Sequence, residues 1–408
     1  MKFTLAFTTL ITLATAQYSG DVVQFWNYRT SYALNASSPR LGSLHESYVG
    51  AFVATAVLAA AEDAKRESRE VQQLAVSHAA HDALTRIFYA QYQRIDAYFK
   101  EIENAVKPSA QQAAAGRRIG EAAAAKVVKA RADDGFATYV PYEFQSPAPG
   151  VYQPTPPNNP IPATQQAKFV RPFGGIRSLP VWKGPPDVRG REFETALKQI
   201  KEKGAKTGST RTADETEIGY YWLESSITYW NRLASLVVGD SLASDVLKSA
   251  QFYAKLNWAI QNAGIIAFVA KNKYDAWRPI TALHYKPVFL RSGRSYYTPE
   301  WEPLSPTPGH QDYLSGHAVY GSSAAGIIRR QVGSDKFKTP LSVLSTVTQD
   351  NVGDVTRTFK SLSQAVKENG DSRVFVGVHF NFASDEGNKA GEVSADLVWK
   401  KGTSDYLS

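Results

Sequence analysis

Apolar residues recur with a helical period along most of the chain. From about Gln17 to Asp134 the sequence is rich in alanine, and apolar side chains return every three or four positions. The same pattern resumes in the second half in these stretches: 213–238, 241–271, 318–331 and a last one after Ser372. No sustained period of two and no internal repeat was found. The pattern predicts an all-α protein, a bundle of packed helices.

Prolines divide this pattern. Of the 21 prolines, 12 lie between Pro141 and Pro186, a density that predicts a long irregular connection wrapping the surface. The predicted organisation is a signal peptide (1–16), an N-terminal helical half (17–135), a Pro-rich irregular connection (136–212) and a C-terminal helical half (213–408).

The first residues are typical of an export signal. Lys2 precedes an apolar run from Phe3 to Leu13, and small residues suited to cleavage follow at 14–16. That run is too short to cross a bilayer, and the next apolar stretch, 50–61, ends at acidic residues. We therefore expect a secreted, extracellular protein without a membrane span.

Composition narrows the class of ligand. With 408 residues and 43% hydrophobic content, the chain can bury a sizeable core. The net charge of +8 mildly favours an anionic ligand, although a solvated basic surface explains it equally well. No block of Lys and Arg is interleaved with aromatic residues, so a nucleic-acid partner is not expected.

Sulfur is nearly absent from the chain. There is no Cys, and the single Met is Met1. Met and Cys are the side chains that strong oxidants damage first, so their absence suits a protein that generates an oxidant, although compositional drift is an alternative. The observation favours an oxidative function without establishing it.

Three segments of the C-terminal half combine unusual residues. In the first, Lys271 and Arg278 are seven positions apart, which predicts that both project from one face of a helix that Pro279 ends or bends. A solvated basic stripe is the alternative for this segment.

The second segment is 310–317. Ser315 is a natural N-cap and Gly316 lets the backbone approach a ligand, so the helix that starts here offers amide donors and a positive dipole end to an anion. His317 would lie beside that anion as a general acid or base. An ordinary capped helix is the alternative.

The third segment, 372–379, places apolar residues between Arg373 and His379. A buried Arg and a buried His need partners, either a ligand or a salt bridge and a core contact. Together the three segments supply three cations, neutral donors and two imidazoles, a set that suits a tetrahedral oxyanion.

In their order and spacing these segments resemble the signature KxxxxxxRP, PSGH and SRxxxxxH of the vanadium-dependent haloperoxidase and type 2 phosphatidic acid phosphatase superfamily. The resemblance extends from about Ile218 to Gly387 and more weakly into the N-terminal helices. It implies a helical bundle of the haloperoxidase and acid phosphatase type, with vanadate as cofactor or phosphate in the same site.

The resemblance also implies roles for single residues. Those expected to bind the oxygens of vanadate or phosphate are Lys271, Arg278, Ser315, Gly316 and Arg373. His379 is similar to the axial vanadium ligand of haloperoxidases, or to the phosphorylated nucleophile of phosphatases. His317 resembles the acid–base residue, and Lys271 would also polarise bound peroxide.

Two positions bear on the halide. His310 falls where bromoperoxidase-like members also have His and chloroperoxidase-like members have Phe, so bromide or iodide is expected. Phe268 matches an aromatic position beside the halide site, although core packing is its alternative role.

The sequence also departs from the family pattern. Leu314 replaces the usual proline, and Ala383 stands where an aspartate is common, which leaves open what orients His379. Asp385 and a backbone carbonyl are candidates. Glu224 is a candidate acidic partner for an arginine of the site.

Three functions follow from these observations. The first is a haloperoxidase that uses hydrogen peroxide, halide and a small organic acceptor. The alternatives are an acid phosphatase with a phosphohistidine intermediate and a non-catalytic oxyanion-binding protein.

Overall fold

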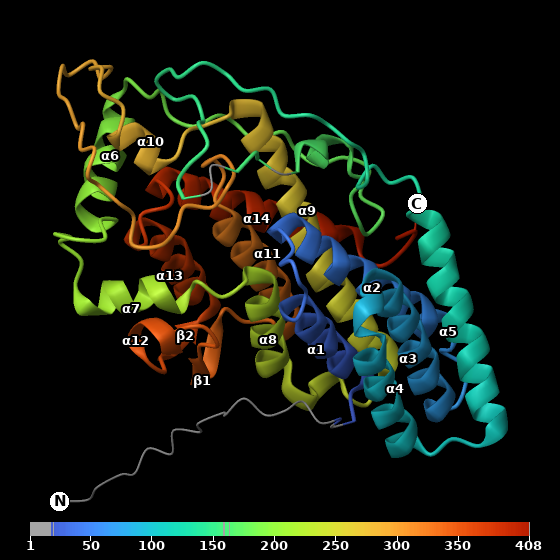
Figure 1. Ribbon diagram of the computed structural model, residues 1–408. Coiled ribbons are helices and arrows are strands. Elements are labelled where there is room, and N and C mark those ends of the chain that lie inside the picture. The colour runs from blue at the N-terminus through green and yellow to red at the C-terminus, as the bar shows by residue number, and fades with distance from the viewer. Residues whose placement is uncertain (1–17, 19, 158–159, 163, 408) are drawn as a thin grey trace, which may run out of the picture.

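The first half of the chain folds into a group of helices that share one core. The computed structural model describes residues 18, 20–157, 160–162 and 164–407, so the predicted signal peptide (1–16) lies outside the described residues. The helices of this half are α1 (Val22–Asn35), α2 (Ser43–Asp63), α3 (Arg69–Ile87), α4 (Tyr92–Val106) and α5 (Ala110–Ala130). They lie together on one side of the molecule, coloured blue to cyan in Figure 1.

Helix α2 is the core of this group. It is long and apolar enough to cross a membrane by length and composition, but 89% of its apolar window is buried inside the protein. Its neighbours are α3, α5 and α9. Side chains that would otherwise face lipid therefore pack against other helices.

The second half is built around one long helix, α9, which packs against α2, α11 and α14. The helices of this half are α6 (Arg191–Lys203), α7 (Ala213–Tyr221), α8 (Ser226–Val238), α9 (Val246–Tyr274), α10 (Pro279–Leu283), α11 (Gly316–Val332), α12 (Gln349–Val352), α13 (Leu362–Phe375) and α14 (Asn381–Lys401). Short 3₁₀ turns are η1 (Tyr89–Gln91), η2 (Gln165–Phe169) and η3 (Gly239–Leu242). The predicted helical architecture is confirmed.

Two helix pairs approach closely because one partner presents a glycine. A Cβ on Gly391 of α14 would lie 2.3 Å from the carbonyl oxygen of Val319 and 2.9 Å from the amide nitrogen of Ser323, both in α11. In the same way, a Cβ on Gly120 of α5 would lie 2.4 Å from the carbonyl oxygen of Ala75 in α3. Backbone contact at these crossings leaves no room for a side chain.

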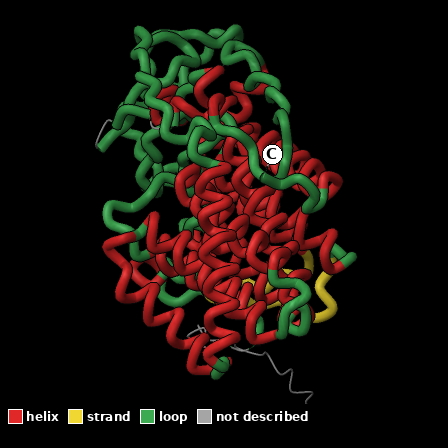
Figure 2. Tube along the Cα trace, turned by 90° about the vertical axis from the view of Figure 1, so that its right-hand side faces the viewer, coloured by secondary structure: helices red, strands yellow, loops and turns green. Residues whose placement is uncertain are grey.

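The Pro-rich stretch runs over one end of the bundle, where both views show loops gathered above the helices (Figures 1 and 2). From Arg131 to Gly190 the described residues contain only the 3₁₀ turn η2 as a helical element. Helix α6 lies inside the predicted irregular stretch 136–212 and was not anticipated. It forms because 191–203 is free of proline and buries Phe193, Leu197 and Ile200 along one face.

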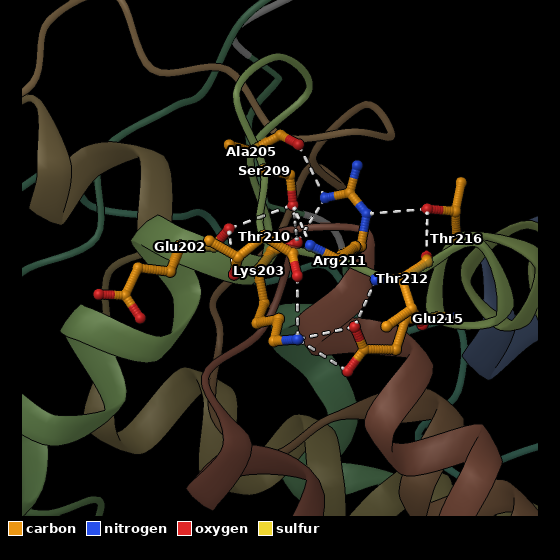
Figure 3. A network of polar contacts seen from close by, with 9 residues as sticks. All are labelled: Glu202, Lys203, Ala205, Ser209, Thr210, Arg211, Thr212, Glu215 and Thr216. Carbon is orange, nitrogen blue, oxygen red and sulfur yellow. Dashed lines mark hydrogen bonds and ion pairs between the residues drawn. The ribbon is translucent and has the colours of Figure 1, made fainter.

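Polar contacts fix the turn that joins α6 to α7 (Figure 3). The Lys203 ammonium donates to Glu215 at 2.7 Å, and Glu215 also forms a capping box with Thr212 at the start of α7. The Arg211 guanidinium donates to the carbonyl oxygens of Lys203 and Ala205. These contacts therefore hold in place the turn at which the predicted C-terminal half begins.

A small antiparallel sheet was also missed. Strands β1 (Lys336–Leu344) and β2 (Thr356–Ser361) pair with Leu344 opposite Thr356, and the register shifts between Lys336 and Leu341. Val343 and Phe359 are their only buried hydrophobic residues. Because the strands are short, mostly exposed and bulged, they show no sustained alternation in the sequence.

Candidate active site

A cavity of about 300 Å³ lies where the N-termini of α2, α8 and α11 meet. Its lining residues come from both halves of the chain and include Gly42, Ser43, Glu46, Ser225, Ser226, Phe268, His310, Gly316, His317, Tyr320, Arg373 and His379. No side chain caps any of these three helix starts. The cavity therefore lies at three positive helix ends whose first-turn amides have no side-chain acceptor, which favours an anion.

Arg373 enters the cavity from the last turn of α13. It is 3% exposed, and its Nε and Nη1 atoms have no hydrogen-bond partner. Burial first, and the nearby charge of Arg278 second, lower the pKa of Arg373 to about 9. A buried guanidinium with free donors is costly unless a ligand accepts from it.

Ser315 and Gly316 form the start of α11. Ser315 is the N-cap as predicted, but its fully buried hydroxyl does not cap the helix and has no partner. Gly316 lines the cavity, and a Cβ built there would meet only the Tyr320 ring at 3.7 Å. Both residues therefore leave polar groups and space for a ligand.

Lys271 lies in the last turn of α9, and Arg278 lies at the start of α10. The prediction that they share a helical face is wrong, because α9 ends at Tyr274 and Asp275 adopts the left-handed conformation. Arg278 is the N-cap of α10, and Pro279 occupies the first helical position, where a missing N–H costs nothing. The two cations converge through a turn between two helices.

Both cations are fully buried. The Lys271 ammonium donates to the carbonyl oxygens of Gln311 at 2.5 Å and Asp312 at 3.0 Å. Arg278 donates to the carbonyl oxygens of His310 and Val378, each at 2.6 Å. Burial lowers the pKa of Lys271 strongly and that of Arg278 to about 10.

His379 lies in the turn between α13 and α14 and is 2% exposed. Its Nδ1 is 2.9 Å from Oδ1 of Asp312, and its Nε2 is 3.2 Å from Nη1 of Arg278. Burial and the charges of Arg278 and Lys271 lower the pKa of His379 strongly, so the ring is neutral. A neutral imidazole with one nitrogen beside a carboxylate is the arrangement of a metal-binding histidine.

Asp312 is the residue that sequence reasoning missed. It is fully buried, and burial raises its pKa to about 7 although Arg278 and Lys271 act in the opposite direction. The available signal was an acidic residue inside the signature segment 310–317, between the candidate residues His310 and Ser315. Its neighbour Gln311 is fixed by donating to Asp275 at 3.0 Å.

His317 lies in the first turn of α11 and lines the cavity. Its Nε2 is buried without a partner, while backbone groups of Trp222 and Glu224 face the ring. Burial and the charge of Arg373 lower its pKa strongly. His317 therefore presents a neutral imidazole that can accept a proton within the cavity.

The two residues proposed for the halide site touch each other. The rings of Phe268 and His310 pack edge to face with centroids 5.5 Å apart, and both line the cavity. Nδ1 of His310 is 3.0 Å from Nη2 of Arg278.

Glu224 and Asp385, the two other acidic candidates from the sequence, do not line this cavity. The Glu224 carboxylate pairs with Arg232 at 2.6 Å rather than with an arginine of the cavity. Asp385 lines a separate cavity of about 610 Å³ beside Glu386 and Lys389. Its place on α14 turns it away from His379, and Asp312 takes the position beside the imidazole instead.

The charges and donors fit an oxyanion better than a bare metal ion. Arg278 and Lys271 lie close enough to lower the pKa of the buried Asp312 carboxyl, and Arg373 adds a third buried cation. Within the part of the chain that the structure describes, no group of three or more His, Asp or Glu side chains could hold a metal ion. An oxyanion brings its own acceptor oxygens to these donors, so the set of residues suits an oxyanion.

Known proteins of similar sequence are vanadium chloroperoxidases. Residues 251–406 match the family model for the second helical-bundle domain of vanadium chloroperoxidase. The chain is 24% identical over 302 residues to vanadium chloroperoxidase from Curvularia inaequalis, an alignment that covers 57% of this chain and 49% of that protein. This chain thus spans about half the length of the curated relative.

Solved structures share the fold over nearly the whole chain. A crystal structure of the first bacterial vanadium-dependent iodoperoxidase superposes with a TM-score of 0.70 at 19% identity, covering 93% of this chain and 94% of that one. A holo-type bacterial vanadium-dependent chloroperoxidase gives a TM-score of 0.71 at 16% identity, covering 94% and 97%. Residues 251–406 thus match the second helical-bundle domain of vanadium chloroperoxidase, and the chain as a whole has the vanadium haloperoxidase fold.

Proposed function

We propose that this protein is a vanadate-dependent haloperoxidase that oxidises halide with hydrogen peroxide, with bromide or iodide favoured over chloride. The observation that carries the proposal is the set of buried donors without partners, Arg373 Nε and Nη1 and Ser315 Oγ, beside a neutral histidine. Such groups are stabilised when an oxyanion accepts from them.

Vanadate, when bound, supplies Lewis acidity that activates peroxide toward halide. Oxygen atoms of the anion would accept from Arg373, Ser315, Arg278 and the amide of Gly316, while His379 would hold it through Nε2. Asp312, 2.9 Å from Nδ1, would favour the tautomer with the proton on Nδ1, so that Nε2, which now lies 3.2 Å from Nη1 of Arg278, is the acceptor atom.

His317 holds or moves a proton at Nε2, the ring atom without a protein partner. A bound anion would favour the charged form of Lys271, whose pKa burial lowers, and the two backbone acceptors of Lys271 fix where that charge would lie. Phe268 and the half-buried His310 narrow the cavity and favour a polarisable halide.

The near absence of sulfur supports an oxidative reaction over phosphate hydrolysis. Without Cys and with Met1 as the only Met, the chain lacks the side chains that hypohalous acid oxidises first. A phosphatase would gain nothing from that composition.

The decisive experiment reconstitutes the purified protein with orthovanadate and measures bromide-dependent halogenation of a cyclic diketone by peroxide. We expect turnover above that of free vanadate, and loss of turnover in His317→Ala. Metal-independent hydrolysis of an aryl phosphate, with phosphohistidine trapped at His379, would instead identify an acid phosphatase. Oxyanion binding without either reaction would identify a binding protein.

A further inference from the structure

Helix α2 brings a carboxylate into the same cavity. Glu46 lies in the first turn of α2 and is 6% exposed. Among the lining residues of the cavity that the structure describes, it is the only Asp or Glu. It belongs to none of the three signature segments, since it comes from the other half of the chain.

Glu46 accepts a hydrogen bond from the start of α8, and few charged side chains lie near it. The Ser225 hydroxyl, at the N-cap of α8, donates to Oε2 of Glu46 at 2.5 Å. Arg40, in the segment before α2, is a cation that acts on Glu46, and Tyr320 of α11 also lies within electrostatic reach of Glu46. The other titratable groups that line the cavity are His310, His317, Arg373 and His379.

Halide oxidation needs a proton in this cavity. The halide gives an electron pair to one peroxide oxygen, a halogen–oxygen bond forms, the oxygen–oxygen bond breaks, and the other oxygen leaves as hydroxide. One proton then converts that hydroxide to water, so the balance is one halide, one peroxide and one proton to one hypohalous acid and one water.

His317 is neutral at rest, because burial and Arg373 hold its pKa well below the ordinary value, so it can relay a proton but needs another group to supply it. For Glu46, burial raises the pKa, while the hydrogen bond from Ser225 and the charge of Arg40 lower it. Burial thus favours the protonated form of the one carboxyl that reaches the cavity.

We propose that Glu46 is the acid that delivers the consumed proton from the α2 wall of the cavity and is reprotonated from solvent past Arg40. This inference rests on the proposed haloperoxidase function. Ser225 adjusts the pKa of Glu46 through the hydrogen bond that its hydroxyl donates. The loop 222–225, which carries Ser225, also contacts His317, because backbone groups of Glu224 face the His317 ring.

The experiment compares vanadate-reconstituted wild type with Glu46→Gln, Glu46→Asp and Ser225→Ala in bromide oxidation between about pH 5 and about pH 8. Glu46→Gln should lower kcat by about 100-fold and remove the basic limb of the pH profile. Glu46→Asp should restore the limb. Ser225→Ala should move the limb to higher pH, because loss of the donated hydrogen bond favours the protonated carboxyl.

Two readouts do not depend on turnover. Calorimetric affinity for orthovanadate should stay unchanged in Glu46→Gln, since Glu46 is not an oxyanion-binding group. Infrared difference spectra between acid and neutral pH should show a carboxylic acid band in wild type that Glu46→Gln lacks. Glu103→Gln, at an exposed position of α4, is the matched control.

A folded Glu46→Gln protein with wild-type kcat and an unchanged basic limb would overturn the assignment of Glu46 alone. An unchanged limb in Ser225→Ala would also count against it. If wild type oxidises no halide, the proposed function fails first, and the proton donor fails with it.

Discussion

Oδ1 of Asp312 lies 2.9 Å from Nδ1 of His379, and both residues are buried. This pair joins the second and third signature segments. It explains how His379 is oriented although Ala383 and Asp385 do not reach it. The carboxylate beside His379 therefore comes from Asp312, which precedes it in the sequence, and not from a residue that follows it.

Loss of the contact between Asp312 and His379 should lower turnover more than it lowers the affinity for orthovanadate. Asp312→Asn keeps the shape of the side chain but no longer fixes the His379 tautomer through a carboxylate. We expect turnover in the reconstituted protein to fall by about 10- to 100-fold. Orthovanadate affinity, measured by calorimetry, should fall less, since three cations remain. Equal turnover in both proteins would show that Asp312 does not act through His379.

Arg373 should dominate oxyanion affinity. Its Nε and Nη1 atoms have no partner in the protein, so Arg373→Ala removes charge-assisted contacts without breaking a salt bridge. We expect a loss of about 1.5–3 kcal/mol in orthovanadate binding, which is roughly one to two orders of magnitude in Kd. Arg118→Ala, an exposed position of α5, should leave the calorimetric titration unchanged. Wild-type affinity in Arg373→Ala would mean that the anion binds elsewhere.

Ser315 should affect stability only when the anion is present. Its buried hydroxyl is unsatisfied in the protein alone, so Ser315→Ala should unfold at or above the wild-type temperature without ligand. Ligand binding stabilises the folded state by mass action. Added orthovanadate should therefore raise the melting temperature of wild type more than that of Ser315→Ala. An equal rise in both proteins would exclude the hydroxyl as a ligand-binding group.

His78 should make stability depend on pH. Burial in α3, against the ring of Phe99, lowers the pKa of His78 to about 4 from about 6.5 in the unfolded chain. The folded state therefore favours the neutral ring, and this stabilisation is present above about pH 6.5 and lost as pH falls toward 4. Urea unfolding midpoints at about pH 7 and about pH 4.5 should differ more in wild type than in His78→Gln. The same pH dependence in both proteins would rule out this contribution.

The crossing of α11 and α14 should not tolerate a side chain at Gly391. A Cβ there would lie 2.3 Å from the carbonyl oxygen of Val319, so Gly391→Ala must separate the helices. We expect destabilisation of about 1–3 kcal/mol, read as a lower melting temperature. Lys389→Ala, exposed on the same helix, should stay within about 1 kcal/mol of wild type. A stable Gly391→Ala protein would show that the crossing can relax.

The sequence alone was sufficient to predict the helical bundle and to single out candidates for oxyanion binding, whose role stays a prediction. Helical periodicity is a local property, and the signature segments each keep their residues within a few positions. The cavity indeed brings Arg373, Gly316, His317 and His379 together. Strands β1 and β2 were missed because few of their residues are buried, and helix α6 was missed because it follows directly on the Pro-rich stretch.

Only the tertiary structure decided which residues meet across the chain. The contacts of Asp312 with His379 and of Glu46 with Ser225 join positions 67 and 179 residues apart, and no local pattern encodes such a contact. The turn at Asp275 similarly placed Arg278 on a new helix instead of the face of α9. The physical reason is that long-range packing, rather than spacing in the sequence, sets the distance between side chains from different helices.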